Sequence, residues 1–259
     1  MNIENLLNKK AFISDMDGVI YHGNKLLPKV KEFVQWLRKE DKNFLFLTNS
    51  SERSPKELSQ KLSRLGIEVP EDHFYTSALA TAMFLGKQCP GGSAYVIGEA
   101  ALTNALYDVG FTMNDVDPDY VVCGETQNYN YDKMVKACQL VRKGAKLIGT
   151  NSDTNGPTET GIVPACGSLI QPIAQAAECK PYFVGKPNPL MMRHALKKIG
   201  CMREETVIVG DRMDTDIIAG VESEIETVLV LSGVTQREDL FSYPYQPGYI
   251  LNGVGEIFE

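Results

Sequence analysis

The sequence predicts an α/β protein with parallel sheets, in which one domain is interrupted by a second, inserted domain. Short apolar runs alternate with segments whose apolar residues recur at helical spacing, which is typical of strand–helix–strand units. The alternation breaks off near Cys89-Pro90-Gly91-Gly92, and a new series of the same kind follows. Polar residues directly follow several of the apolar runs, which is where open α/β sheets bind ligands.

The first series has three predicted strands and three predicted helices. Residues 30, 33, 34 and 37 are apolar and recur at helical spacing, with Pro28 suited to a first turn. Ser54-Pro55 opens another helix, and Gly66 closes it. We expect strands over residues 11–14, 44–47 and 74–77, and helices over 28–39, 54–65 and 78–87.

The second series is large enough to form a separate α/β module. We expect its strands over residues 94–97, 120–122 and 146–149, and its helices over 100–109, 131–143 and 167–177.

After Lys180-Pro181 the sequence returns to the alternation of strands and helices seen in the first series. Strands are expected over 182–184, 206–209 and 226–230, and helices over 189–199 and 215–221. The last third needs the sheet of the first third to cover its strands. We therefore expect residues 1–78 and 181–259 to form one domain, and residues 79–180 to form the inserted one.

The composition limits the classes of partner. The 259 residues are 43% hydrophobic, and 26 basic against 33 acidic residues give a net charge of −7. A nucleic-acid surface would need a basic stripe, and no apolar run approaches the length of a membrane span. Residues 1–10 are too polar for a signal peptide. We expect a cytoplasmic protein without nucleic-acid or membrane partners; a homo-oligomer is possible but not indicated.

The six cysteines do not point to a redox or thiol mechanism. They form no CxxC pair, and none has an arginine six residues later, which excludes the cysteine-phosphatase signature. Reduced, mostly buried thiols are expected.

Two carboxylates follow the first strand. In the stretch from Ala11 to Ile20, Asp15 and Asp17 are one residue apart, and alternation along a strand would point both the same way. Crowded carboxylates repel each other unless a cation or a shared proton is present. An acidic turn after an edge strand is the alternative. An EF-hand loop fits poorly, because Val19 and Ile20 occupy positions that require an oxygen ligand and a glycine.

Thr48-Asn49-Ser50-Ser51 follows the second strand. A hydroxyl and free backbone N–H groups ahead of a helix can hold phosphate oxygens. The alternative is that these residues cap a helix.

Gly185-Lys186-Pro187 lies at another strand end. An ammonium group there can neutralise a carboxylate or a transferring phosphoryl group. A Walker A loop is excluded, since the sequence has no GxxxxGK[ST]. A solvated surface lysine is the alternative.

Gly210-Asp211-Arg212-Met213-Asp214-Thr215-Asp216 places three acids after a four-residue apolar run. Carboxylate-only ligation suits Mg²⁺. Capping of the following helix is the alternative, with Asp214 as the candidate cap.

Taken together, the four stretches resemble the four motifs of the haloacid dehalogenase (HAD) superfamily. An insertion of about a hundred residues between the second and third motifs resembles the superfamily's type IIA cap. Four segments are similar to NagD-like phosphatases: residues 116–120, 122–126, 150–156 and 164–167. The resemblance covers nearly the whole chain. It implies a Rossmann-like parallel-sheet core with an inserted α/β cap, and a Mg²⁺-dependent phosphatase that hydrolyses a small phosphorylated metabolite such as a nucleoside monophosphate or sugar phosphate.

The resemblance also implies roles for individual residues. Asp15 would attack the phosphate and form an aspartyl-phosphate, and Asp17 would act as the general acid and base. Mg²⁺ would be held by Asp15, the backbone carbonyl of Asp17, and Asp211, with Asp216 in support.

Thr48 and Asn49, with nearby backbone N–H groups, would bind the phosphoryl oxygens, and Lys186 would neutralise charge on Asp15 and on the phosphate. In the cap, the loop 151–156 is the candidate substrate reader. Its Asn151, Asp153 and Asn155 follow the strand over 146–149, although the same residues suit a plain hydrophilic turn.

Other assignments are weaker. A phosphotransferase or mutase would keep the same acids, and a non-catalytic phosphometabolite-binding protein is a further alternative, which the presence of both Asp15 and Asp17 disfavours. A dehalogenase needs neither Asp17 nor a metal. His73 and His194 are expected to be structural and His22 to lie in a surface loop, whereas the role of Arg212 stays open.

Overall fold

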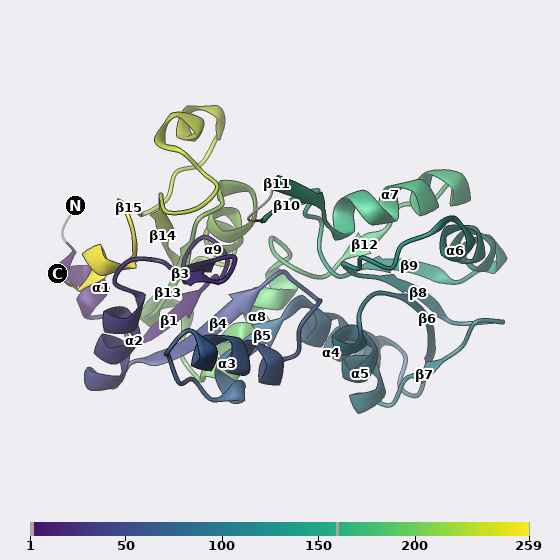
Figure 1. The fold of residues 1–259 in the computed structure, drawn as a ribbon, viewed down its shortest axis with the longest axis horizontal. Helices are drawn as coiled ribbons and strands as arrows, with labels where there is room; N and C mark the ends of the chain where they lie inside the picture. The colour runs from purple at the N-terminus through teal and green to yellow at the C-terminus, as the bar shows by residue number, and fades with distance from the viewer. Residues whose placement is uncertain (1–2, 159–160, 259) are drawn as a thin grey trace. The chain divides into compact units, whose positions relative to one another are not determined.

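The chain divides into two compact units in its computed structural model, which describes residues 3–158 and 161–258 (Figure 1). Unit 1 comprises Met1–Thr48, Pro55–Tyr75 and Lys186–Glu259, and unit 2 comprises Asn49–Ser54 and Thr76–Gly185. The segment Asn49–Ser54 thus belongs to unit 2, although the sequence places it in the first series of strands and helices. The chain passes from one unit to the other directly after Thr48 and directly before Lys186.

Unit 1 is organised around a six-stranded sheet with the order β15-β14-β13-β1-β4-β5. The central strand β1 lies between β4 and β13 (Figure 1). It pairs with both in parallel, and Ser14 is opposite Phe46 and Val209. The strands are β1 (Ala11–Ser14), β4 (Asn43–Thr48), β5 (Phe74–Thr76), β13 (Thr206–Gly210), β14 (Glu226–Val230) and β15 (Tyr249–Leu251).

The core of unit 1 forms because the apolar runs are buried along their whole length. Every residue of β1 and β13 is buried, as expected for strands of a parallel sheet that is covered on both faces. Phe12 of β1 meets Phe33 and Trp36 edge-on, with ring centroids 6.2 and 5.4 Å apart. The helices are α1 (Glu4–Leu7), α2 (Val30–Lys39), α3 (Pro55–Arg64), α8 (Pro189–Ile199) and α9 (Ile218–Glu222).

One predicted helix of unit 1 is wrong in its first turn. In place of an α-helix from residue 215, the chain forms a π-helical turn, η3 (Met213–Ile217), followed by the short helix α9. Ile217 N donates to Arg212 O, five residues earlier, at 3.1 Å. Such wide turns are frequent at functional sites, and this one carries Asp216.

The sequence patterns also missed the edge strand β15 and the small hairpin of β2 (Tyr21–His22) and β3 (Lys25–Leu26).

Unit 2 has its own five-stranded sheet with the order β12-β9-β8-β6-β7, and all of its neighbouring strands are parallel. Its core includes Val121, Leu147 and Ile170. The strands are β6 (Ser93–Ile97), β7 (Thr112–Met113), β8 (Tyr120–Cys123), β9 (Lys146–Gly149) and β12 (Tyr182–Phe183). The helices are α4 (Ser77–Gln88), α5 (Ala100–Asp108), α6 (Tyr131–Lys143) and α7 (Cys166–Ala177).

The predicted polar loop over 151–156 is only partly a loop. Its last two residues belong to β10 (Asn155–Thr158), which pairs in an antiparallel hairpin with β11 (Gly161–Pro164). Asn155 is therefore a strand residue and is exposed. Strand β10 is not predicted from the sequence, because Asn-Gly-Pro is typical of turns and not of strands.

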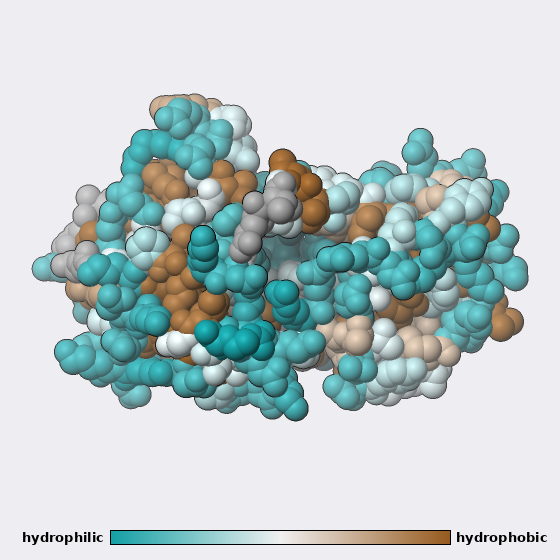
Figure 2. Space-filling model, viewed as in Figure 1, coloured by the Kyte–Doolittle hydropathy of each residue, from teal (hydrophilic) through white to brown (hydrophobic). Residues whose placement is uncertain are grey.

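Hydrophilic side chains cover most of the face drawn in Figure 2, in keeping with a chain that is 23% charged. Within residues 3–158 and 161–258, no helix is long and apolar enough to cross a membrane.

Candidate active site

Three of the predicted site residues lie at the carboxyl end of the sheet of unit 1. Asp15 directly follows β1, Thr48 is the last residue of β4, and Asp211 directly follows β13. The parallel pairing brings these strand ends to one edge of the sheet. Asp15 N continues the ladder by donating to Val209 O at 2.8 Å, which holds the backbone of Asp15 beside β13.

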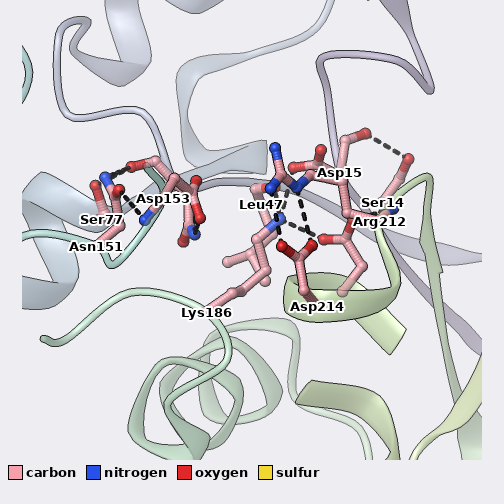
Figure 3. Close-up of polar contacts among 11 residues, drawn as sticks. Ser14, Asp15, Leu47, Ser77, Asn151, Asp153, Lys186, Arg212 and Asp214 are labelled. Atoms are coloured by element: carbon pink, nitrogen blue, oxygen red, sulfur yellow. Dashed lines mark hydrogen bonds and ion pairs between the residues drawn. The ribbon is translucent and has the colours of Figure 1, made fainter. Parts of the chain in front are cut away.

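Lys186 joins two of the acids. Its Nζ lies 2.6 Å from Asp15 Oδ1 and 2.6 Å from Asp216 Oδ1, and it also donates to Leu47 O at 3.4 Å (Figure 3). The side chain is 2% exposed, so the alternative of a solvated surface lysine is wrong.

Asp15, Asp211 and Asp216 form a buried cluster in which carboxylate oxygens lie within 4.8 Å of one another. Asp211 Oδ2 accepts from Val234 N at 2.7 Å, and Asp216 Oδ2 accepts from Arg212 N at 3.1 Å. Asp211 Oδ1 is buried and has no hydrogen-bond partner among the described residues. A buried carboxylate oxygen without a donor is unfavourable in a folded protein unless a cation binds it.

The ionisation of the cluster reflects this crowding. Burial raises the pKa of Asp15 well above its usual range, with Lys186 opposing the shift and Asp216 and Asp211 adding to it. Burial, followed by the charge of Asp216, raises the pKa of Asp211 to about 7. For Lys186, burial alone would lower the pKa, but Asp15 and Asp216 outweigh burial and raise it.

Two glycines make room for Asp211. A Cβ atom on Gly233 would lie 2.0 Å from Asp211 Oδ2, and one on Gly18 would lie 2.3 Å from the same oxygen. Gly18 also has a φ of +82°, in the left-handed region that favours glycine. Both positions therefore require glycine if Asp211 is to keep its place.

The donor set fits a hard divalent cation. Three carboxylates without a nitrogen or sulfur ligand are the set that Mg²⁺ prefers, and the unpartnered oxygen of Asp211 faces no competing donor among the described residues. The acidic cluster could thus hold a metal ion.

The carboxylate of Asp17 is not a member of this cluster. It is exposed, whereas Asp15 is buried, and it forms an isolated bridge with Tyr21. β1 ends at Ser14, so the strand alternation that was expected to aim both carboxylates the same way does not extend to them.

Arg212 and Asp214 pair with each other. Arg212 Nε and Nη2 donate to the two carboxylate oxygens of Asp214 at 3.1 and 3.0 Å (Figure 3). The alternative of Asp214 as a helix cap is therefore wrong, because no side chain caps the η3 turn.

The loop after β4 does not cap a helix either. Thr48 is buried, and α3 begins only at Pro55. Asn49 Nδ2 donates to both carboxylate oxygens of Asp153, at 3.2 and 3.1 Å. Asn49 O accepts from Asn151 Nδ2 at 2.7 Å and from the hydroxyl of Ser77 (Figure 3).

Asn151 is fully buried, and its side-chain amide is used inside unit 2. Besides Asn49 O, its Nδ2 contacts a carboxylate oxygen of Glu125, and its Oδ1 accepts from Asp153 N at 3.1 Å. Asp153 is half-buried. Of these two predicted substrate ligands, Asp153 is the one with an accessible side chain.

Sequence reasoning missed Glu125 as a site residue. Its carboxylate accepts from Ser51 N at 2.9 Å and from the hydroxyl of Ser51, in addition to Asn151. Glu125 lies in the segment 122–126 that is similar to NagD-like phosphatases, but that segment alone indicates no role for the carboxylate, because its partner Ser51 is distant in the sequence.

His73 and His194 are in structural contacts as expected, and His22 is exposed as expected, although it belongs to strand β2 and not to a loop. His73 Nδ1 lies 2.9 Å from Phe44 O, His194 Nδ1 lies 3.1 Å from the hydroxyl of Tyr75, and His22 is exposed on its hairpin.

Comparison with known proteins finds two family models on this chain. A model described as haloacid dehalogenase-like hydrolase matches residues 12–112, and a HAD-hydrolase-like model matches residues 183–257. The ribonucleotide monophosphatase NagD of Escherichia coli is 45% identical over 96% of this chain and 98% of its own length. A dihydroxyacetone phosphatase of Corynebacterium glutamicum is 41% identical over 95% of this chain and 90% of its own length. The structure of a glycerol phosphate phosphatase from Mycobacterium tuberculosis in complex with magnesium is 28% identical, with a TM-score of 0.92 over 98% of this chain and 77% of that one.

Proposed function

The chain belongs to the NagD-like phosphatases of the haloacid dehalogenase superfamily and is a phosphoric monoester hydrolase, and we propose that unit 1 hydrolyses a small phosphomonoester through Asp15. The observation that carries this proposal is the buried cluster in which Lys186 joins Asp15 and Asp216 beside Asp211. A nucleophilic carboxylate, a neutralising ammonium and a cation site lie together at the end of one sheet.

In the first step, an oxygen of Asp15 attacks the phosphorus and the bond to the leaving oxygen breaks, which gives an aspartyl-phosphate. The exposed carboxyl of Asp17 donates a proton to the leaving oxygen. In the second step, Asp17 takes a proton from water, the water attacks the phosphorus, and Asp15 is released. Lys186, 2.6 Å from Asp15 Oδ1, favours the ionised, nucleophilic form of Asp15 and so opposes the rise in the pKa of Asp15 that burial causes.

We propose Mg²⁺ as the cofactor, held by Asp15, the backbone carbonyl of Asp17, and Asp211, with Asp216 supporting the site. When bound, it supplies positive charge to the phosphoryl group. The orphaned oxygen of Asp211 supports this assignment, and so does the magnesium in the related glycerol phosphate phosphatase.

Thr48 is proposed to bind the phosphoryl oxygens together with the backbone N–H groups of the loop that begins at Asn49. We expect unit 2 to choose the substrate, with Asp153 as the contacting side chain and Asn151 as its support. The relatives are named for a ribonucleotide, a triose and a glycerol phosphate, so they support small phosphorylated metabolites as the substrate class.

The test is phosphate release from a panel of nucleoside monophosphates, sugar phosphates and a generic aryl phosphate, with Mg²⁺ and with excess chelator. Asp15→Asn keeps the shape but removes the nucleophile, and it should lower turnover at least about 10³-fold. Asp214→Asn makes the same chemical change at a surface ion pair and should stay within about threefold of wild type. More than a few per cent of activity in Asp15→Asn would contradict the covalent route, and full turnover in chelator would contradict the metal.

A further inference from the structure

We propose that Glu125 is a positioning residue, which fixes the loop Asn49–Ser51 and, through that loop, the carboxylate of Asp153. The inference rests on the proposed function, because Asp153 is the side chain that we expect to contact the substrate. All of the residues concerned belong to unit 2.

The carboxylate of Glu125 joins two segments that are far apart in the sequence. One oxygen accepts from Ser51 N at 2.9 Å and from the Ser51 hydroxyl, and the other accepts from Asn151 Nδ2. Glu125 N donates back to Ser51 Oγ at 3.2 Å. Ser51 and Asn151 are both 0% exposed, so water cannot replace these acceptors.

The network continues from Asn151 to Asp153. Asn151 Nδ2 holds the carbonyl of Asn49 at 2.7 Å, and Asn151 Oδ1 accepts from Asp153 N at 3.1 Å. Asn49, placed in this way, donates its side-chain amide to both oxygens of Asp153. The Asp153 carboxylate is thus held from its backbone and from its side chain, and both supports lead back to Glu125.

The loop Asn49–Ser51 is closely packed against its neighbours in unit 2. A Cβ atom on Gly124 would lie 2.5 Å from Ser51 Oγ, and one on Gly185 would lie 2.7 Å from Asn49 Oδ1. Thr150 Oγ1 adds a bond to Ser51 Oγ at 3.3 Å. Once the Glu125 acceptors are lost, Ser51 and Asn151 have buried donors without partners, and their loops must shift to satisfy them.

Glu125→Gln replaces one acceptor by an amide that must face either Ser51 N–H or the amide of Asn151. We expect the kcat/KM ratio between the best metabolite and a generic aryl phosphate to fall about tenfold, mainly through KM for the metabolite. Glu99→Gln is the matched control. That carboxylate is also half-buried and accepts a hydroxyl, from Thr126 at 2.6 Å, and its loss should leave the ratio within about twofold.

The decisive experiment is a double-mutant cycle with Asp153→Ala on the same ratio. If Glu125 acts by placing Asp153, Glu125→Gln should change the ratio in the wild-type background and leave it unchanged once Asp153 is alanine. A general structural defect would lower both backgrounds equally, which would overturn the inference. Thermal melts establish that the variants are folded.

If Glu125→Gln does not fold, Ser51→Ala removes one donor from the opposite side and should show the same dependence on Asp153. Additive effects of Ser51→Ala and Asp153→Ala on the ratio would overturn the inference about Glu125 but would leave the proposed function standing. Absence of turnover on every phosphomonoester by the wild-type chain would overturn the proposed function and this inference with it.

Discussion

Replacing Lys186 by methionine tests how the buried cluster is held together. The substitution keeps an unbranched side chain of similar length but removes the charge that lies 2.6 Å from both Asp15 and Asp216. Two buried carboxylates then remain beside Asp211 without a counter-ion. Removal of one partner from a buried ion pair costs about 3–5 kcal/mol, against a total stability of about 5–15 kcal/mol for a typical domain.

The chain provides its own probe for this measurement. Trp36 is the only tryptophan, and it stacks on Phe33 and Phe258 in the core of unit 1. Urea unfolding of the metal-free protein, followed by tryptophan fluorescence, therefore reports on unit 1 without interference from unit 2. Lys10→Met is the control, since Lys10 pairs with Glu205 at the surface and its loss should shift the midpoint little.

The stability that Lys186→Met loses should depend on pH, and the direction of that dependence follows from the raised pKa of the Asp15 carboxyl. Burial raises the pKa of Asp15 in the folded state, so ionisation of Asp15 opposes folding, and the opposition grows as pH rises above the unfolded pKa of about 4. Without Lys186 the destabilisation should be larger at pH 8 than at pH 5. Adding Asp216→Asn to Lys186→Met should recover at least about 1 kcal/mol relative to the sum of the single changes. A loss below about 1 kcal/mol at pH 8, or strict additivity, would refute the reasoning.

Three further predictions concern the metal and the acid–base residue. Asp17→Asn should lower kcat at least about 10²-fold in steady-state assays but leave the melting temperature unchanged, because the side chain is exposed. The pKa of Asp211, raised to about 7, means that the metal-free fold loses stability as pH rises from about 4 to 7, and that Mg²⁺ must displace a proton below pH 7. Thermal stabilisation by Mg²⁺ should therefore increase from pH 6 to pH 8, and a flat profile would contradict Asp211 as a ligand. Gly233→Ala should displace Asp211 and abolish that stabilisation, whereas Gly253→Ala, whose Cβ would meet nothing within 4 Å, should retain it in the same melting assay.

The central strands and the residues that follow them could be predicted from the sequence because both depend on local pattern. Apolar runs such as Thr206–Gly210 have no polar face, so only a sheet covered on both sides suits them. Polar residues directly after such runs must lie at the carboxyl edge of the sheet. This reasoning placed Asp15 and Asp211 together without any knowledge of the strand order.

What could not be predicted depends on distant or unusual contacts. The π-helical turn that carries Asp216 has an ordinary helical pattern in the sequence. Its hydrogen bonds include contacts with distant residues, such as Met213 N to Thr235 Oγ1 and Tyr245 Oη to Met213 O, which no local pattern predicts. Glu125 has no periodic signal, since its importance comes from Ser51 and Asn151. Asn151 was expected to contact substrate because it is polar and follows a strand, yet its amide serves the protein's own backbone.

The strand order of unit 1 also determines when its sheet can be completed during synthesis. β1 needs β13 on one side, and β13 leaves the ribosome only after all of unit 2 and α8. At about 5–20 residues per second, that interval is on the order of ten seconds. Throughout it, the apolar strand β1 has an unpaired edge that can pair with other chains. The sheet of unit 2, in contrast, has all of its strands in the continuous segment Thr76–Gly185, which is complete before β13 is made. Strand β1 of unit 1 therefore waits longer for its partner β13 than any strand of unit 2 waits for a sheet partner.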